Sequence, residues 1–156
     1  MTVIDSDNLA LVETRFGAFE ASARDVVHFA GGLPGFEGCT RYVLLKAPEL
    51  TPFTCLHGLD GSKPSFLVID PRQVHSTYAT GLNDVECRRL EASPRDPLAW
   101  FVIVRVGPDE DATVNLRAPL VINPRRMRGI QSLPHESAYR HDHPLRLEPH
   151  RAGVHA

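Results

Sequence analysis

Cysteine is scarce in this chain of 156 residues, and no two cysteines are closely spaced. Cys39, Cys55 and Cys87 form no Cys-x-x-Cys pair, and their number is odd. An odd count without paired spacing argues against a disulfide framework and favours reduced thiols in a cytoplasm. We therefore interpret the three cysteines as small core or surface thiols and not as nucleophiles.

Long apolar runs are also missing. The longest run, "LAWFVIV" at 98–104, is far shorter than the roughly 20 residues that a membrane-spanning helix needs. The first ten residues, "MTVIDSDNLA", lack the basic start and the apolar stretch of a signal peptide. These absences predict a soluble, cytoplasmic protein without a membrane partner.

The sequence has no excess of positive charge and no recognisable catalytic motif. The net charge is −2, whereas nucleic-acid binders are usually basic. No G-x-S-x-G nucleophile elbow occurs, and "GGLPGFEG" at 31–38 has neither the GxGxxG nor the GxxxxGK spacing. We predict a tight glycine turn there that presents Leu33 and Phe36. The chain is predicted not to be an enzyme and not to contact nucleic acid directly.

Short apolar segments with strand-like patterns make up most of the chain. They lie at 9–20, 26–30, 41–45, 53–59, 65–70, 100–106 and 112–116. The turn clusters "DGSKP" and "GPDED" join the last four segments into two hairpins. Many short strands with close turn signals indicate an antiparallel β-barrel or sandwich.

One short helix is predicted near residues 82–90. Asn83 is a good N-cap, and Glu86 stands three residues later, where its carboxylate can complete a capping box. Pro94 and Pro97 prevent any extension. The prediction is therefore a single all-β domain that covers residues 1–145 and contains one short helix. A disordered tail is predicted at 146–156.

The stretch "TVNLRAPLVINP" at 113–124 contains a strand that is interrupted by proline. Pro119 has no backbone N–H to donate to a sheet, so we expect a sharp bend there between two strands. Such a bend is predicted to carry the chain from one side of a barrel to the other. Arg117 is expected to hold the bend through local carbonyls. The "RRMR" stretch at 125–128 is interpreted as a solvated loop, with contact to an acidic partner as the alternative.

Histidines gather near the C-terminus. They are His135, His141, His143, His150 and His155. His141 and His143 would share one face of an extended segment, and His135 could supply a third metal ligand. We favour adventitious capture of metal by a loose tail, and no metal or other cofactor is predicted.

Four segments, in their order and spacing, resemble the flagellar assembly factor FliW family. They are "GLPGFE" (32–37), "FLVIDP" (66–71), "VNLRAPLVINP" (114–124) and "YRHDHPL" (139–145). The resemblance runs from about Thr14 to Leu145 and implies a small, mostly antiparallel β-barrel without catalysis.

The resemblance also implies a cytoplasmic switch between two protein partners. Proteins of this family bind flagellin near its C-terminal helical region. When flagellin is scarce, the freed protein binds the translational regulator CsrA away from its RNA site, lowers its RNA affinity and so releases flagellin mRNA. The free protein is expected to be a monomer.

Exposed apolar anchors carry most of the energy of a protein interface. We expect six residues to form or orient the partner surface: Phe36, Phe53, Leu56, His57, Asn115 and Arg117. Because the chain is only mildly acidic and carries "RRMR", a flagellin-binding chaperone without regulator antagonism is one alternative. A small-ligand or metal-binding β-barrel is the other.

Overall fold

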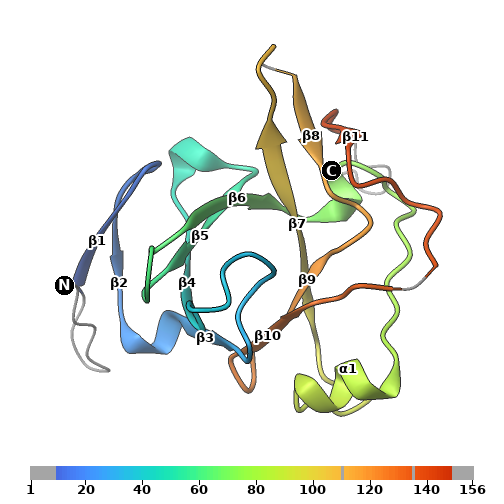
Figure 1. Ribbon diagram of the computed structural model, residues 1–156, viewed down its shortest axis with the longest axis horizontal. Helices are drawn as coiled ribbons and strands as arrows, with labels where there is room; N and C mark the ends of the chain where they lie inside the picture. The colour runs from blue at the N-terminus through green and yellow to red at the C-terminus, as the bar shows by residue number, and fades with distance from the viewer. Residues whose placement is uncertain (1–9, 110, 135, 149–156) are drawn as a thin grey trace.

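A seven-stranded β-barrel forms the body of the protein in the computed structural model, which describes residues 10–109, 111–134 and 136–148. Its strands are β3 (Val26–Phe29), β4 (Arg41–Leu45), β5 (Thr54–Gly58), β6 (Ser65–Ile69), β7 (Ala99–Val106), β9 (Leu120–Asn123) and β10 (Arg128–Gln131). They follow the order β7-β6-β5-β4-β3-β10-β9, and the pairing of β9 with β7 closes the barrel (Figure 1). The predicted all-β barrel is confirmed.

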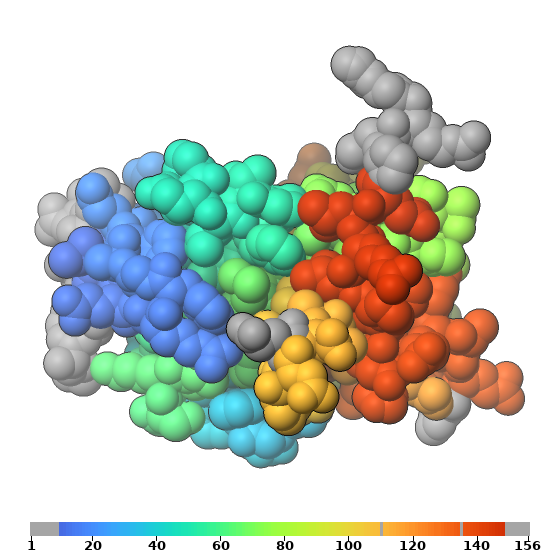
Figure 2. All heavy atoms as spheres, turned by 90° about the horizontal axis from the view of Figure 1, so that it is seen from above, coloured from blue at the N-terminus to red at the C-terminus, as the bar shows by residue number. Residues whose placement is uncertain are grey.

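Smaller elements surround the barrel. They are the strands β1 (Ala10–Thr14), β2 (Gly17–Ala21), β8 (Ala112–Val114) and β11 (His143–Pro144), the helix α1 (Asp84–Arg89), and three 3-10 turns at Ala23–Asp25, Pro48–Leu50 and Pro71–Gln73. The β1–β2 hairpin is a separate sheet that packs on the outer face of β4 and β5. Strands β8 and β11 extend the sheet beyond β7. Figure 2 shows the β7–β8 connection standing between the β1–β2 hairpin and the C-terminal segment.

Local sequence signals place several elements correctly. Both predicted hairpins, β5–β6 and β7–β8, are present. Helix α1 begins as predicted, because Asn83 Oδ1 accepts from Glu86 N at 2.8 Å and Glu86 Oε1 accepts from Asn83 N at 3.1 Å. In the described part of the chain, no helix has the length and apolarity to cross a membrane. The predicted tail lies mostly outside the described residues, although Glu148 N donates to Gln73 O at 2.8 Å.

Strand alternation divides the core into an inner and an outer part. Inward residues of β7, namely Ala99, Phe101 and Ile103, pack in the barrel interior with Tyr42 and Leu56. The outward residues pack instead under the loops and the C-terminal segment, with Ile69, Val74, Tyr78, Val114 and Leu116. Burial of apolar side chains on both faces of the sheet is what holds this small barrel together.

The proline-interrupted stretch follows a different path from the one predicted. β8 pairs with residues 104–106 of β7, and β9 pairs with residues 99–101 of the same strand. The chain therefore stays beside β7, and the expected crossing of the barrel is wrong. Asn115 Oδ1 accepts from the backbone N–H groups of Arg117 and Ala118, each at 3.1 Å. The guanidinium of Arg117 makes no hydrogen bond to a described residue. Asn115 therefore holds the bend, and the prediction that Arg117 holds it is wrong.

The parallel pair β3–β10 depends on a glycine. Gly129 stands opposite Phe29 in this pairing. A Cβ at Gly129 would lie 2.5 Å from Phe29 Cζ, much closer than van der Waals contact. Only glycine lets the closing strand lie against the aromatic ring. β10 was not predicted, and the "RRMR" stretch proves to be the β9–β10 turn together with the first residue of β10.

We expect Gly129→Ala to lower the free energy of unfolding by about 1–3 kcal/mol, because the added methyl group overpacks the Phe29 ring. Urea unfolding followed by circular dichroism measures the change. Gly38→Ala is the matched control, since nothing lies within 4 Å of its Cβ position. Equal midpoints for the two variants would contradict this account of barrel closure.

Asn115→Ala should lower the free energy of unfolding by about 1–2 kcal/mol, because two backbone donors at the bend lose their acceptor. Arg117→Ala should change it by less than about 0.5 kcal/mol, as expected of an exposed side chain. The same urea titration distinguishes the two. A larger decrease in the free energy of unfolding for the Arg117 variant than for the Asn115 variant would show that Arg117 holds the bend.

Candidate partner-binding site at the barrel mouth

Residues 30–40, which we call the plug loop, join β3 to β4 and lie over one end of the barrel (Figure 1). The predicted tight turn is confirmed, because Phe36 N donates to Leu33 O at 2.7 Å. Gly32 adopts φ +70°, and a Cβ there would lie 2.6 Å from Phe36 O. The prediction that the turn presents Leu33 is wrong, because Leu33 enters the barrel core, whereas Phe36 stays half-buried.

Asp60 fixes the C-terminal end of the plug loop. Its carboxylate accepts from the backbone N–H groups of Thr40 at 3.3 Å and Arg41 at 3.1 Å. It also accepts from the Arg41 guanidinium at 2.7 and 3.1 Å. The hydrogen bonds from the Arg41 side chain hold the pKa of Asp60 below its usual value. The turn pair Asp60-Gly61, which suggested only a hairpin, therefore also anchors the loop above the barrel.

A pocket of about 360 Å³ lies beside the plug loop, and we call it the mouth pocket. Leu33, Phe36, Phe66 and Ile103 provide its apolar walls, and Leu133 forms a lip. The rings of Phe36 and Phe66 meet edge to face, with centroids 5.3 Å apart. Aromatic pairs prefer this geometry, so one wall of the pocket is held by a favourable contact between the loop and the barrel.

The pocket opens where two barrel strands part. The β6–β7 ladder ends at Val68↔Ile103, although β7 continues to Val106. Residues 99, 101 and 103 point into the barrel, and the same alternation places Arg105 beyond its end, at the rim of the pocket. Arg105 is exposed. The inward-facing register of β7 thus places the guanidinium of Arg105 at the barrel mouth.

The rim of the mouth pocket is polar and positive. It contains Arg105, Asn115, Gln131 and His141, and none of its described lining residues is acidic. Gln131 Nε2 donates to Ala118 O at 3.0 Å, and Asn115 holds the bend, so both amides are fixed in place. The site therefore combines apolar walls with a rigid polar rim, which suits recognition of an amphipathic group.

The structure brings together only two of the six residues predicted for the partner surface. Phe36 and Asn115 both line the mouth pocket. Arg117 is exposed but lines a different depression, near Tyr139. Phe53 is half-buried in the outer core with Ile69. The remaining two lie in β5, where every residue is buried.

Leu56 is completely buried in the barrel interior, which argues against direct contact with a partner. His57 is 6% exposed, and its Nδ1 lies 2.6 Å from Ser65 Oγ. Burial, with a smaller effect of Lys63, lowers the pKa of His57. His57 lines a separate, open depression beside the β1–β2 hairpin.

Phe66, Arg105 and Leu133 belong to the pocket but were not singled out from the sequence. Of these three, Arg105 alone left a signal in the sequence, because it interrupts the otherwise continuous apolar run of its strand. Of the C-terminal histidines, His141 is at the pocket rim and His143 is in β11. His135, His150 and His155 lie outside the described residues. Within the described ranges, no three His, Cys, Asp or Glu side chains form a group that could hold a metal ion.

The family model for the FliW protein matches residues 10–145, which is most of the chain. This chain belongs to the FliW family. The flagellar assembly factor FliW of Geotalea uraniireducens is 34% identical over 138 residues, which cover 88% of this chain and 84% of that protein. The flagellar assembly factor FliW of Thermotoga maritima is 30% identical over 142 residues, covering 90% and 95%.

A solved structure supports the same assignment. The crystal structure of a flagellar assembly factor FliW matches with a TM-score of 0.75 and 30% identity, covering 95% of this chain and 99% of that chain. The resemblance to the FliW family is thus confirmed, and so is the barrel that it implied. In this chain the plug loop, the bend at Asn115, and the residues Gln131, Leu133 and His141 lie around one pocket.

Asp60→Asn should lower the free energy of unfolding at pH 7 by about 1–2 kcal/mol, because the acceptor for Arg41 loses its charge. The folded-state pKa of Asp60 lies below the ordinary value of about 3.9. Its stabilising effect is therefore present above that value and is lost as the pH falls through the folded-state pKa.

The difference from the unmodified protein should therefore shrink between pH 5 and pH 2, a window set by about 3.9 as the unfolded value. Urea unfolding at several pH values tests this. Asp109→Asn is the control, because Asp109 is exposed and bonds to no described residue. A difference that stays constant with pH would show that Asp60 does not act through its charge.

Proposed function

We propose that this FliW-family protein is a cytoplasmic, non-catalytic switch that binds two protein partners in turn. It binds flagellin, and when flagellin is absent it binds the translational regulator CsrA and weakens the hold of CsrA on flagellin mRNA. The free protein is a monomer. Membership of the FliW family carries this proposal, because flagellin and CsrA are the partners that the family resemblance implies.

The mouth pocket supports a role in protein binding. Leu133 is 61% exposed at its lip, and Phe36 and Phe66 are half-buried in its walls. A few apolar anchors on a rigid scaffold are what a protein interface needs. The barrel, the Phe36–Phe66 contact and the Asp60 anchor provide that rigidity.

A catalytic role finds little support in the side-chain arrangement. His57 and Ser65 form the strongest candidate dyad, at 2.6 Å. In the described part of the chain, no carboxylate hydrogen-bonds to the other ring nitrogen of His57, so no third group orients it as a base. The contact is better explained as a hydrogen bond that satisfies a buried imidazole.

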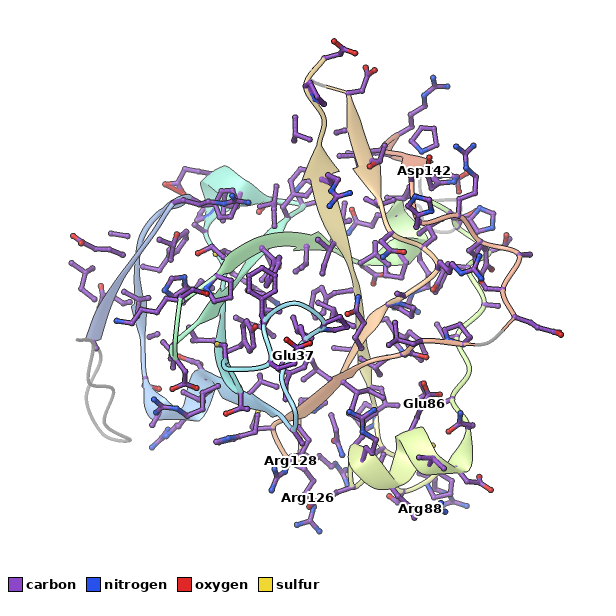
Figure 3. The ribbon with its side chains drawn as sticks, in the orientation of Figure 1. Glu37, Glu86, Arg88, Arg126, Arg128 and Asp142 are labelled. Atoms are coloured by element: carbon purple, nitrogen blue, oxygen red, sulfur yellow. The ribbon has the colours of Figure 1, made fainter. Side chains whose placement is uncertain are left out.

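The arginines after the bend bear on the choice between the full switch and a chaperone. Arg128 lies 3.3 Å from Glu91, and Arg125 lies 3.4 Å from Asp96. In Figure 3, Arg126 and Arg128 lie on the same side of the molecule as Arg88 of α1. Local carboxylates thus offset part of the positive charge. The net charge of only −2 still favours the second candidate, a flagellin-binding chaperone without regulator antagonism, because mild acidity repels RNA weakly.

A three-component titration tests the proposal. Purified protein is mixed with the cognate flagellin and the cognate CsrA, and complexes are followed by size-exclusion chromatography with light scattering at low and high salt. We expect a complex with each partner and displacement of CsrA by flagellin. The CsrA complex should weaken more at high salt if charge contributes.

Binding of flagellin alone would favour the chaperone. Binding of neither partner would contradict both candidates. Reciprocity offers an internal check, because flagellin must lower the affinity for CsrA by the same factor by which CsrA lowers the affinity for flagellin.

A further inference from the structure

The mouth pocket presents more apolar surface to water than the barrel needs for its own stability. Phe66 and Ile103 pack against the barrel core and yet remain partly exposed in the pocket walls. Leu133, at the lip, is 61% exposed. An apolar pocket with an apolar lip is the usual form of a site that receives one large side chain from a partner.

Arg105 is the one residue among the described lining residues of the pocket that is an Asp, Glu, Lys or Arg. Arg105 and His141 stand at the rim, and Arg105 makes no ion pair with any described residue. Two acidic residues that directly follow lining residues of the pocket in the sequence, Glu37 and Asp142, are already engaged. Glu37 accepts from Gly35 N at 3.0 Å, and Asp142 accepts from Arg140 Nε at 2.9 Å. Among the described residues no carboxylate pairs with the Arg105 guanidinium, which lies beside the apolar walls and suits a carboxylate of a partner.

We propose that the mouth pocket binds a bulky aliphatic side chain of a partner protein that has an aspartate or glutamate within one or two residues of it. The aliphatic side chain packs between Phe66, Ile103 and Leu133. The carboxylate meets Arg105 at the rim. This inference deepens the proposed function in one respect, since it gives the chemistry of the protein segment that the site takes.

The shape of the site favours a protein segment over a small metabolite. The volume of about 360 Å³ is near the lower limit for small-molecule pockets, which span roughly 300–1,000 Å³. The exposed lip at Leu133 would remain in water beside a small ligand, whereas a polypeptide covers it. Asn115 and Gln131 are held by the bend, so their amides are positioned to meet the backbone of such a segment.

Blocked dipeptides test the chemistry without any partner protein. N-acetyl-Leu-Asp-amide, N-acetyl-Leu-Asn-amide and N-acetyl-Ser-Asp-amide are titrated into ¹⁵N-labelled protein, and amide shifts are mapped. We expect the Leu-Asp probe to bind with a millimolar dissociation constant, of the order that one anchor supports, and to shift amides at residues 103–105 and 131–133. Leu-Asn should bind roughly three- to fivefold more weakly, since an exposed charge pair contributes little more than that.

Two variants complete this test. In Arg105→Gln the Asp and Asn probes should bind equally, whereas in the remote exposed variant Arg24→Gln the preference should remain. Shifts that are absent from the pocket, or that are equal for the Leu and Ser probes, would overturn the proposal. Equal binding of the Asp and Asn probes to the unmodified protein would overturn its anionic part.

The same surface is then tested on the whole partners. Leu133→Ser should weaken the complex with flagellin or with CsrA by about tenfold, as expected for an anchor contact. Val106→Ser is the matched control, because Val106 is 64% exposed on β7 but does not line the pocket. If the unmodified protein binds a partner and both serine variants bind it equally well, the pocket is not the anchor site. If it binds neither partner, the proposed function fails, while the dipeptide result still decides the chemistry of the pocket.

Discussion

The contact between Gly129 and the ring of Phe29 is the constraint on which the barrel depends. It lies in the parallel pair of β3 and β10, which closes the curved sheet together with the pairing of β9 and β7. The Phe29 ring can lie against β10 only because the glycine has no side chain. With closure, every barrel strand gains a partner on both edges, which removes the exposed edges on which open sheets aggregate.

Closure also determines where the functional surface lies. A closed barrel has two ends, and the plug loop covers one of them through Leu33 and the edge-to-face contact of Phe36 with Phe66. β6 and β7 pair with each other only as far as Val68 and Ile103, and both strands continue beyond that point. The inward alternation of β7 therefore continues past the rim, where Arg105 is exposed. The mouth pocket thus results from the separation of β6 and β7 beside a loop that is anchored by Asp60. The backbone therefore sets the position of the pocket, and the polar side chains at the rim set its chemical character.

Patterns among residues that are close in sequence allowed much of the fold to be predicted. Elements that depend on contacts between distant residues could not be predicted in this way. The capping residues Asn83 and Glu86 correctly predicted the start of α1, and the predicted strand at 41–45 has the same bounds as β4. β10 escaped prediction because it has four residues and one large apolar side chain, Ile130, which is buried against Val121 of β9 and against Leu90, far away in the chain. Leu56 was misjudged for a related reason. The barrel interior covers one face of β5 and the β1–β2 hairpin covers the other, so no residue of that strand is exposed. The pocket unites residues from Leu33 to His141, and no local pattern could have shown it.

The parallel pairing of β3 with β10 also has a consequence for the synthesis of the protein. Phe29 and Gly129 stand opposite each other although they are far apart in the chain. At roughly 5–20 residues per second, a ribosome needs several seconds to make the segment between them. During that time β3 has β4 as a neighbour, but its other edge waits for a strand that does not yet exist. A nascent chain of this protein therefore carries an open sheet until β10 has been made, and closure of the barrel waits for that strand.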